Sequence, residues 1–310
     1  MPTKLPTGSI ANERGHAATS PAKASEAGSA NAAKHKTGYL YAPAIGNDTV
    51  NSIMGYVANR LAGHKTPYAV VVRNEGDKLS LRKSITEYKT SSDCAKIVSM
   101  CDPKSVDTSK SRKSSSKFTN KYTIIEAARS ALQYKLDIKV NDAEAVLPNL
   151  DEATTKLYIL GHGKSGGGGD GIYIKTSEGK SERLSSQVLA ERLKQDGLPM
   201  EYKDVRLIAC HGKDKPSLDK PSTGQLVANA MGEAGFSKVQ VTAYPEQHLV
   251  MPRIFGDGKL HRAVLCDGKN KPKIASAEKQ IFHPQTQLPA ANSEPQADTA
   301  KTEVSGQHQL

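Results

Sequence analysis

Two short apolar runs, residues 156–160 and 205–209, constrain the possible folds of this chain most strongly. Each run ends at a reactive side chain, His162 or Cys210, and reaches a glycine within two positions. Apolar runs of this length that end at turn residues are typical of buried parallel strands. The carboxyl ends of parallel strands meet at one edge of an open α/β sheet, where such folds bind ligands. If the two strands are neighbours, about 4.8 Å apart, His162 and Cys210 lie within reach of each other.

A cysteine and a histidine at one sheet edge suit nucleophilic chemistry. A thiolate attacks a carbonyl carbon, and a neighbouring histidine supports the thiolate and donates a proton to the leaving amine. Because Gly163 has no Cβ, its backbone N–H can approach the developing oxyanion, with the N–H of Cys210 as a second donor. The pattern therefore predicts a cysteine hydrolase with His162 and Cys210 as its catalytic pair.

Each of these residues also has an ordinary structural interpretation. Taken alone, Cys210 would be a buried structural thiol and His162 a turn histidine satisfied by the backbone. The repeated arrangement at the ends of two strands favours catalysis over both. We expect His211 to be simply exposed, and Cys94 and Cys101 to be inert. A metal site is disfavoured because no other ligand clusters with Cys210 and His211.

Elsewhere the chain alternates strand-like runs with helical periodicity. This alternation predicts an α/β fold with a mostly parallel sheet and helices on both faces. Ile53, Val57 and Leu61 form one apolar helical stripe. Asp48 or Thr49 is the expected N-cap of that helix. The other predicted helices span residues 123–134, 185–194 and 223–233, and the other predicted strands span residues 39–41, 68–73, 172–174 and 239–244.

Two hairpins are also predicted. Residues 74–77 have turn composition, so residues 78–82 are expected to pair back on the preceding strand. Near the C-terminus, residues 249–254 and 260–265 flank a turn at Gly256-Asp257-Gly258. This second hairpin is expected to be an appendage of the sheet.

The composition divides the chain into three parts. Residues 1–37 and 283–310 contain few large apolar side chains, so they cannot bury enough surface to offset chain entropy, and we expect both to be disordered. Residues 38–282 form one predicted domain, with an insertion at about 84–150 that contains an exposed Ser/Lys-rich loop. The polar leader is similar to the unfolded export signals of type III secretion effectors.

The charge of the chain favours an anionic partner, since the net charge is +11 and the pI is about 9.3. Nucleic acid is disfavoured because the chain has no Trp and no alternation of aromatic and basic residues. A polyphosphate or an anionic membrane surface fits the charge equally well. No apolar run is long enough for a transmembrane segment or a secretory signal. The four scattered cysteines match neither a disulfide framework nor a zinc site, which favours a reducing compartment.

The two motifs resemble those of the caspase-like clan of cysteine peptidases. Within that clan the chain is most similar to the autoprocessing cysteine protease domains of large clostridial toxins and of multifunctional-autoprocessing repeats-in-toxin proteins, over roughly residues 45–275. Residues 62–72 resemble that family's first helix-to-strand junction, and the C-terminal hairpin resembles its β-flap. The resemblance places His162 and Cys210 on the catalytic dyad. It places Asp48 nearest to the aspartate that orients the histidine.

The resemblance also implies a ligand. Those toxin domains are switched on by inositol hexakisphosphate, a host-cytosolic polyanion that lysines and arginines hold behind the flap. A polyphosphate of this kind would account for the positive charge, and a solvated basic face is the alternative. The positions that resemble the family's ligands are Lys65, Lys156, Lys259, Arg262 and Lys269.

These features predict a secreted bacterial effector or toxin, a monomeric thiol protease that cleaves a host protein in the host cell cytoplasm and responds to inositol hexakisphosphate. Ala209 departs from the glycine that toxin domains often have before the nucleophile. We expect no large effector domain before this one, and therefore cleavage of another protein rather than self-processing. Two other classes stay open: an inert peptidase-like module that binds a host protein or a polyanion, and a cysteine-dependent transferase.

Overall fold

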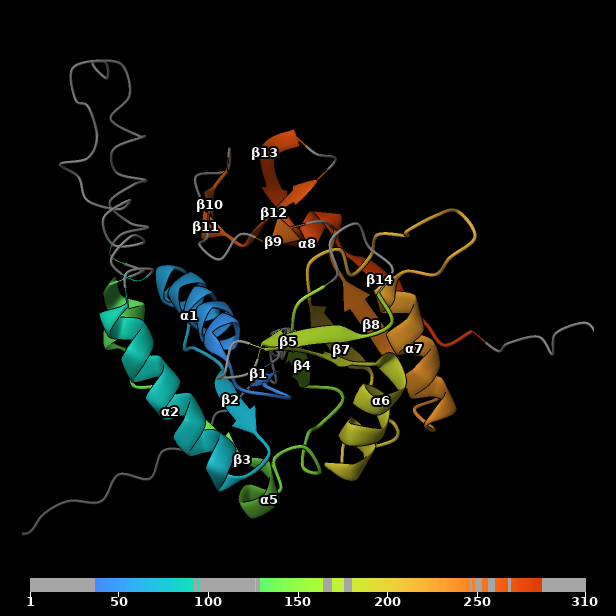
Figure 1. Cartoon of the computed structure of the whole chain (residues 1–310), viewed down its shortest axis with the longest axis horizontal. Helices are drawn as coiled ribbons and strands as arrows, with labels where there is room; N and C mark the ends of the chain where they lie inside the picture. The colour runs from blue at the N-terminus through green and yellow to red at the C-terminus, as the bar shows by residue number, and fades with distance from the viewer. Residues whose placement is uncertain are drawn as a thin grey trace, which may run out of the picture. The chain divides into compact units, whose positions relative to one another are not determined.

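The computed structural model describes residues 37–91, 94, 126, 129–163, 169–175, 180–245, 247–248, 253–255, 260–266 and 269–285, all within one compact unit. Its centre is a seven-stranded sheet with the strand order β14-β8-β7-β4-β1-β2-β3 (Figure 1). Neighbouring strands run parallel, except that the edge strand β14 pairs antiparallel with β8. The strands are β1 (Thr37–Tyr41), β2 (Ala69–Val72), β3 (Ile138–Val140), β4 (Thr155–Leu160), β7 (Asp204–Ile208), β8 (Gln240–Ala243) and β14 (Gln280–Phe282).

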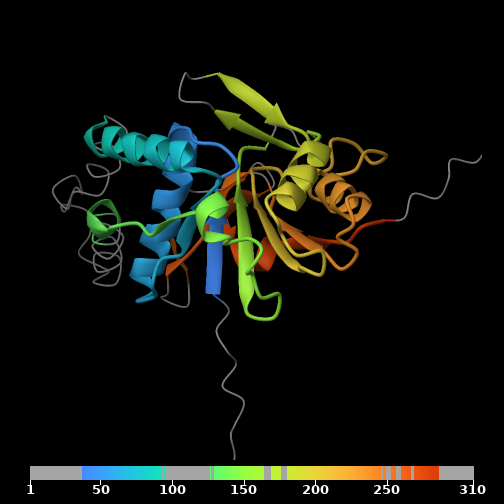
Figure 2. The ribbon, with the colours of Figure 1, turned by 90° about the horizontal axis from the view of Figure 1, so that it is seen from below.

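Helices cover both faces of this sheet. On one face lie α1 (Asn47–Ala62) and α2 (Glu75–Thr90), and on the other lie α6 (Ser186–Gln195) and α7 (Thr223–Glu233) (Figure 2). Successive strand side chains alternate between the two cores: Leu157 packs with α6 and α7, whereas Tyr158 packs with α1. The predicted α/β fold with a mostly parallel, helix-flanked sheet is confirmed.

Smaller antiparallel sheets lie outside the central one. The hairpin β5 (Ile172–Lys175) and β6 (Ser181–Leu184) follows β4 along the chain. The C-terminal part contains two further sheets and the short helix α8 (Ala275–Glu278), which lie together in Figure 1. Their strands are β9 (Gln247–His248), β10 (Arg253–Ile254), β11 (Leu260–His261), β12 (Ala263–Cys266) and β13 (Lys269–Ile274).

The predicted C-terminal hairpin is seen in part. Strand β10 pairs antiparallel with β11, as expected for the two flanking segments. The predicted second arm, residues 260–265, divides between two sheets, because β12 pairs with β9 and β13 instead. The predicted turn at residues 256–258 lies outside the described residues.

The predicted hairpin at residues 78–82 is wrong, because these residues belong to helix α2. The side chain of Asn74 accepts a hydrogen bond of 2.9 Å from the backbone N–H of Asp77, so the presumed turn is a helix N-cap. Leu81, Ile85 and Tyr88 are buried at helical spacing. Turns and helix N-termini favour the same residue types. The helical spacing of the apolar residues that follow distinguishes the helix from a hairpin.

The predicted cap of α1 is also wrong, because the helix begins at Asn47 with Gly46 as its N-cap. Thr49 instead donates its hydroxyl to the carbonyl oxygen of Ala44, at 3.2 Å. At the start of α6, Ser185 is the N-cap and accepts a hydrogen bond from the N–H of Val188. Helix α7 has the predicted bounds, Thr223 to Glu233.

A polar cluster around the buried Asp196 carboxylate joins four parts of the chain. The Tyr41 hydroxyl donates to the Asp196 carboxylate at 2.6 Å, and the Arg73 Nε donates to the same carboxylate at 3.0 Å. The Asn141 side-chain amide donates to the Asp196 carbonyl oxygen at 2.8 Å. Burial raises the pKa of Tyr41, with the negative charge of Asp196 adding to the effect. This cluster holds β1, the ends of β2 and β3 and the end of α6 together.

Candidate active site

The two organising strands are neighbours. Strand β4 pairs parallel with β7, with Leu160 opposite Ile208, and His162 and Cys210 each follow two positions later. The N–H of Gly161 donates to the Ile208 carbonyl oxygen at 3.2 Å, so the pairing extends past the end of β4. The structure therefore brings His162 and Cys210 to the same edge of the sheet, and both are half-buried.

Gly163 lies against the main chain of Cys210. A Cβ built on Gly163 would overlap the carbonyl oxygen of Cys210 and would lie 3.2 Å from its backbone nitrogen. Only glycine fits this approach. The two backbones thus meet where the oxyanion donors were expected, and the donor role of Gly163 stays a prediction.

The backbone of His162 is held by the β5–β6 hairpin. The N–H of His162 donates to the Tyr173 carbonyl oxygen at 2.7 Å, and the N–H of Tyr173 donates back at 2.8 Å. The start of the hairpin is tied down as well, because the Asp170 carboxylate accepts from the Ser186 N–H at 3.1 Å. The segment is therefore positioned by backbone pairing on both sides, with Gly161 bonded to β7 and His162 to β5.

The chain turns sharply after Cys210, and we call residues 210–214 the nucleophile turn. His211 has a φ of 55°, in the left-handed region that costs a non-glycine residue about 1–2 kcal/mol. Its ring Nδ1 lies 2.9 Å from a carboxylate oxygen of Asp214. The expectation that His211 is simply exposed is wrong, since its side chain is 24% exposed and pairs with Asp214. The strained turn is held by its surroundings.

The remaining predicted site residues fall away from this edge or outside the described atoms. Asp48 lies in the first turn of α1, but its side chain is outside the described part, and Cys101 is outside altogether. Cys94 is buried beside α1 and α2, and burial raises the pKa of its thiol. A raised pKa makes Cys94 a poor nucleophile at neutral pH.

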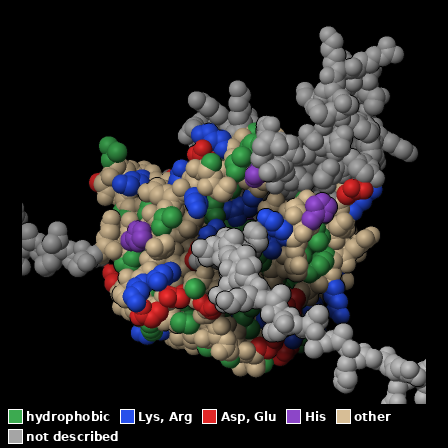
Figure 3. Space-filling model, turned by 180° about the vertical axis from the view of Figure 1, so that it is seen from behind, with side chains coloured by type: hydrophobic (Ala, Val, Ile, Leu, Met, Phe, Trp, Pro, Cys, Tyr) green, Lys and Arg blue, Asp and Glu red, His purple; other side chains and the backbone are tan. Residues whose placement is uncertain are grey.

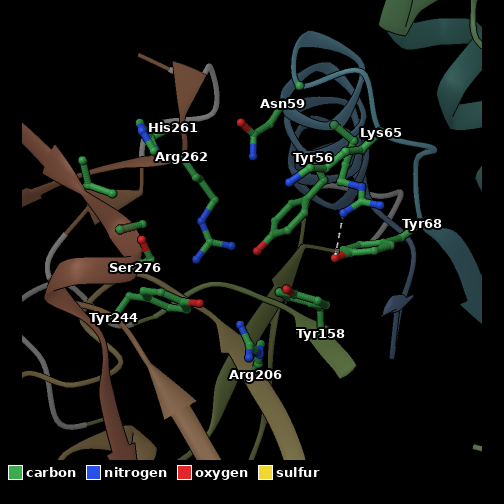
Figure 4. Close-up of a pocket in the computed structure, with 14 residues that line it drawn as sticks. Tyr56, Asn59, Lys65, Tyr68, Tyr158, Arg206, Tyr244, His261, Arg262 and Ser276 are labelled. Atoms are coloured by element: carbon green, nitrogen blue, oxygen red, sulfur yellow. Dashed lines mark hydrogen bonds between the residues drawn. The ribbon is translucent and has the colours of Figure 1, made fainter. Parts of the chain in front are cut away.

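A second feature lies beside β4 and β7, a cavity of about 330 Å³ that Tyr158 and Arg206 help to line. We call it the basic cavity, because its lining contains four basic side chains of Lys and Arg and no carboxylate among the described residues. Basic side chains gather around a hollow on this face (Figure 3), and Figure 4 shows the lining side chains. They are Tyr56, Asn59, Arg60, Gly63, Lys65, Tyr68, Tyr158, Arg206, Tyr244, His261, Arg262, Ile274, Ala275 and Ser276.

Arg262 is a desolvated basic side chain in the lining of this cavity. Its guanidinium carbon lies 4.3 Å from the ring centre of Tyr244 and 5.0 Å from that of Tyr56. Its Nε is buried and has no hydrogen-bond partner among the described residues. Burial lowers the pKa of Arg262 to about 9. A desolvated charge without a counter-charge is unfavourable, and a bound anion would remove the penalty.

Tyr56 carries a second unsatisfied group in the same place. Its side chain is 8% exposed, and its buried hydroxyl has no partner within the described part of the chain. Figure 4 shows the Tyr56 hydroxyl and the Arg262 guanidinium directed into the same space. Burial also raises the pKa values of Tyr158 and Tyr244, so their hydroxyls stay protonated donors at neutral pH. The lining therefore offers hydrogen-bond donors as well as positive charge.

The other basic side chains of the cavity differ in the hydrogen bonds and ion pairs that they form within the protein. Arg206 pairs with Asp204, its Nε lying 2.8 Å from the carboxylate. Arg60 donates to the Tyr68 hydroxyl at 3.0 Å and to the Thr66 carbonyl oxygen, and its guanidinium stacks on the Tyr68 ring. Lys65 forms no ion pair with a described carboxylate. Lys65 and Arg262 are thus the cations best placed to receive an external anion.

The structure brings together two of the five positions predicted to bind a polyanion, Lys65 and Arg262. Lys156 lies on β4, two positions before Tyr158, and is not part of the lining. Lys259 and the side chain of Lys269 lie outside the described part. The sequence prediction missed Arg60, Arg206, His261 and the tyrosines. Arg206 and Tyr158 interrupt otherwise apolar strands, and this was the available signal.

Among the described residues, no cluster of His, Cys, Asp and Glu is arranged to hold a metal ion. None of the described helices has the length and apolar character needed to cross a membrane. Comparison of the chain with known protein families, with curated proteins and with solved structures finds no match.

Proposed function

We propose that this protein is a cysteine endopeptidase of caspase-like type that uses Cys210 and His162. The observation that carries the proposal is the parallel pairing of β4 with β7, which delivers both reactive residues to one sheet edge. The fit of Gly163 against the Cys210 backbone supports it, because this contact brings the main chain of Gly163 next to that of the proposed nucleophile. The half-buried state of both residues suits a site that a peptide can reach.

The reaction would proceed in two steps. The Cys210 sulfur forms a bond to the carbonyl carbon of the scissile peptide, and the C–N bond breaks as the amine takes a proton from His162. Water, deprotonated by His162, then attacks the thioester and releases the carboxylate and the thiol. The N–H groups of Gly163 and Cys210 would hold the negative oxygen in both steps.

The same proposal includes activation by inositol hexakisphosphate. It is supported by the Arg262 Nε and the Tyr56 hydroxyl, which have no hydrogen-bond partner among the described residues, and by the absence of carboxylates among the described lining residues. The C-terminal strands β11 and β12, which carry His261 and border Arg262, would act as the flap over this ligand. A host-cytosolic activator fits a secreted bacterial effector that cleaves a host protein inside the host cell.

Labelling by an electrophilic peptide probe, with and without inositol hexakisphosphate, tests the proposal. We expect labelling to map to Cys210, to increase with the ligand, and to disappear in Cys210→Ala. Cys94→Ala serves as the matched control and should label like the wild type. Full labelling of Cys210→Ala would refute the peptidase assignment.

A second candidate is an inert peptidase-like module that binds a polyanion. The basic cavity favours it independently of the catalytic pair. The Arg262 Nε and the Tyr56 hydroxyl lack a described hydrogen-bond partner, so a ligand would stabilise them whether or not Cys210 reacts. Saturable binding of inositol hexakisphosphate, measured by calorimetry, without any probe labelling would support this candidate over the enzyme.

A further inference from the structure

The nucleophile turn contacts the wall of the basic cavity through Lys213. The backbone N–H of Lys213 donates to the Tyr244 carbonyl oxygen at 2.9 Å. The ring of Tyr244 lines the cavity and lies under the guanidinium of Arg262. A Cβ built on the preceding residue, Gly212, would lie 3.2 Å from the Cβ of Ala243, so the turn packs closely on the end of β8. The first link between turn and cavity is therefore a backbone contact.

The side chain of Lys213 makes a second link, to helix α8. Its Nζ donates to the Glu278 carbonyl oxygen at 2.9 Å and lies 3.9 Å from the Glu278 carboxylate. Both side chains are about a quarter exposed, so the contact is partly shielded from water. Lys273 approaches the other oxygen of the same carboxylate, at 3.5 Å. Lys213 is thus fixed to the C-terminal end of α8.

The opposite end of α8 belongs to the basic cavity. Ala275 and Ser276 are lining residues, and the N–H of Ala275 donates to the Arg262 carbonyl oxygen at 2.9 Å. An anion that engages the Arg262 guanidinium would order the main chain at Arg262 and, through this hydrogen bond, the start of α8. Ala275 and Glu278 are the two ends of this single turn, so Glu278 and the Lys213 side chain would respond together.

We propose that Lys213 is a positioning residue that transmits anion binding in the basic cavity to Cys210. The activation of Cys210 rests on the proposed function. The coupling between anion binding and the conformation of the nucleophile turn does not. Three positions separate Lys213 from Cys210. Fixing Lys213 at both its backbone and its side chain would narrow the conformations of the strained turn at His211 and so orient the thiol.

The test measures the nucleophile turn directly. Hydrogen exchange of the backbone amides of residues 210–214 is followed with and without saturating inositol hexakisphosphate, whose binding is measured in parallel by calorimetry. The variants are Lys213→Met, which removes the donor and keeps much of the stem, and Lys213→Arg, which keeps a cationic donor. Lys215→Met is the matched control, because Lys215 is exposed and makes no ion pair with a described residue.

In the wild type we expect the ligand to slow exchange in the turn by about fivefold or more, in line with ordinary coupling energies. Lys213→Met should bind the ligand with little change in affinity yet show almost no slowing. Lys213→Arg should restore the slowing, and Lys215→Met should match the wild type. Full slowing in Lys213→Met, or none in a wild type that binds the ligand, would overturn the inference, and a ligand that does not bind overturns its premise. Absence of peptide-probe labelling would instead refute the peptidase assignment and leave the exchange result standing.

Discussion

Tyr158 on β4 and Arg206 on β7 are register partners, and the guanidinium carbon of Arg206 lies 5.5 Å from the centre of the Tyr158 ring. Each stands four positions before a reactive residue, Tyr158 before His162 and Arg206 before Cys210. Both side chains line the basic cavity. The strands that carry the candidate catalytic pair at their ends therefore also form the wall of the cavity beneath it. A ligand in the cavity would therefore contact the strands that carry the candidate pair.

Arg262→Met should have opposite effects on the ligand-free and ligand-bound protein. Without ligand, removal of a desolvated guanidinium that lacks a described counter-charge should raise the free energy of unfolding by roughly 1 kcal/mol or more. With inositol hexakisphosphate at a hundredfold excess over Kd, the wild type should gain about 2.7 kcal/mol and the variant much less. Thermal unfolding with and without ligand measures both. Arg183→Met, an exposed position on β6, should change neither.

Tyr56→Phe tests the second unsatisfied group. A buried hydroxyl without a partner costs about 1–3 kcal/mol, so its removal should stabilise the ligand-free protein and weaken anion binding. Tyr41→Phe is the matched control of opposite sign, because the Tyr41 hydroxyl donates to the Asp196 carboxylate at 2.6 Å. Chemical denaturation of both variants decides the point. If Tyr56→Phe lost as much stability as Tyr41→Phe, the Tyr56 hydroxyl would be satisfied within the protein.

Gly163→Ala should displace the main chain beside the nucleophile. The new Cβ would overlap the Cys210 carbonyl oxygen, so either the loop after β4 or the nucleophile turn must move. We expect probe labelling of Cys210 to fall by about 10²-fold or more, the size of effect produced when oxyanion donors are lost. Gly63→Ala, labelled like Gly163→Ala in the absence of any cavity ligand, is the control, since no atom lies closer than 3.6 Å to its added Cβ. Equal labelling of the two variants would show that the contact does not matter for reactivity.

Variants of His211 distinguish the effect of the backbone turn from that of the imidazole ring. Its φ of 55° is unfavourable for alanine and free for glycine. If the turn is what positions Cys210, His211→Ala should lower the rate of probe labelling by about tenfold, and His211→Gly should retain more of it. Single-turnover labelling rates measure the difference. A glycine variant as slow as the alanine variant would assign the effect to the ring and its pairing with Asp214.

The local pattern of the chain was enough to predict the fold class and the position of the reactive pair. Short buried strands and amphipathic helices are encoded by neighbouring residues, so β4, β7, α6 and α7 could be located from periodicity alone. The placement of His162 and Cys210 at one sheet edge could also be predicted, because the ends of adjacent parallel strands share that edge. Local patterns were ambiguous at residues 74–82, where residues typical of a turn begin a helix. Strands β3 and β14 have only three residues each, too few to show a periodic pattern.

Only the tertiary structure revealed the basic cavity. Arg60, Tyr158, Arg206, Tyr244 and Arg262 come from α1, β4, β7 and the C-terminal segment, and no spacing in the chain relates them to one another. Their convergence depends on strand order and register, which are set by long-range packing of the whole core. The sequence by itself therefore determined which residues could react and which strands would carry them. The tertiary structure decided which charges would be left without a partner, because desolvation and pairing depend on neighbours in space.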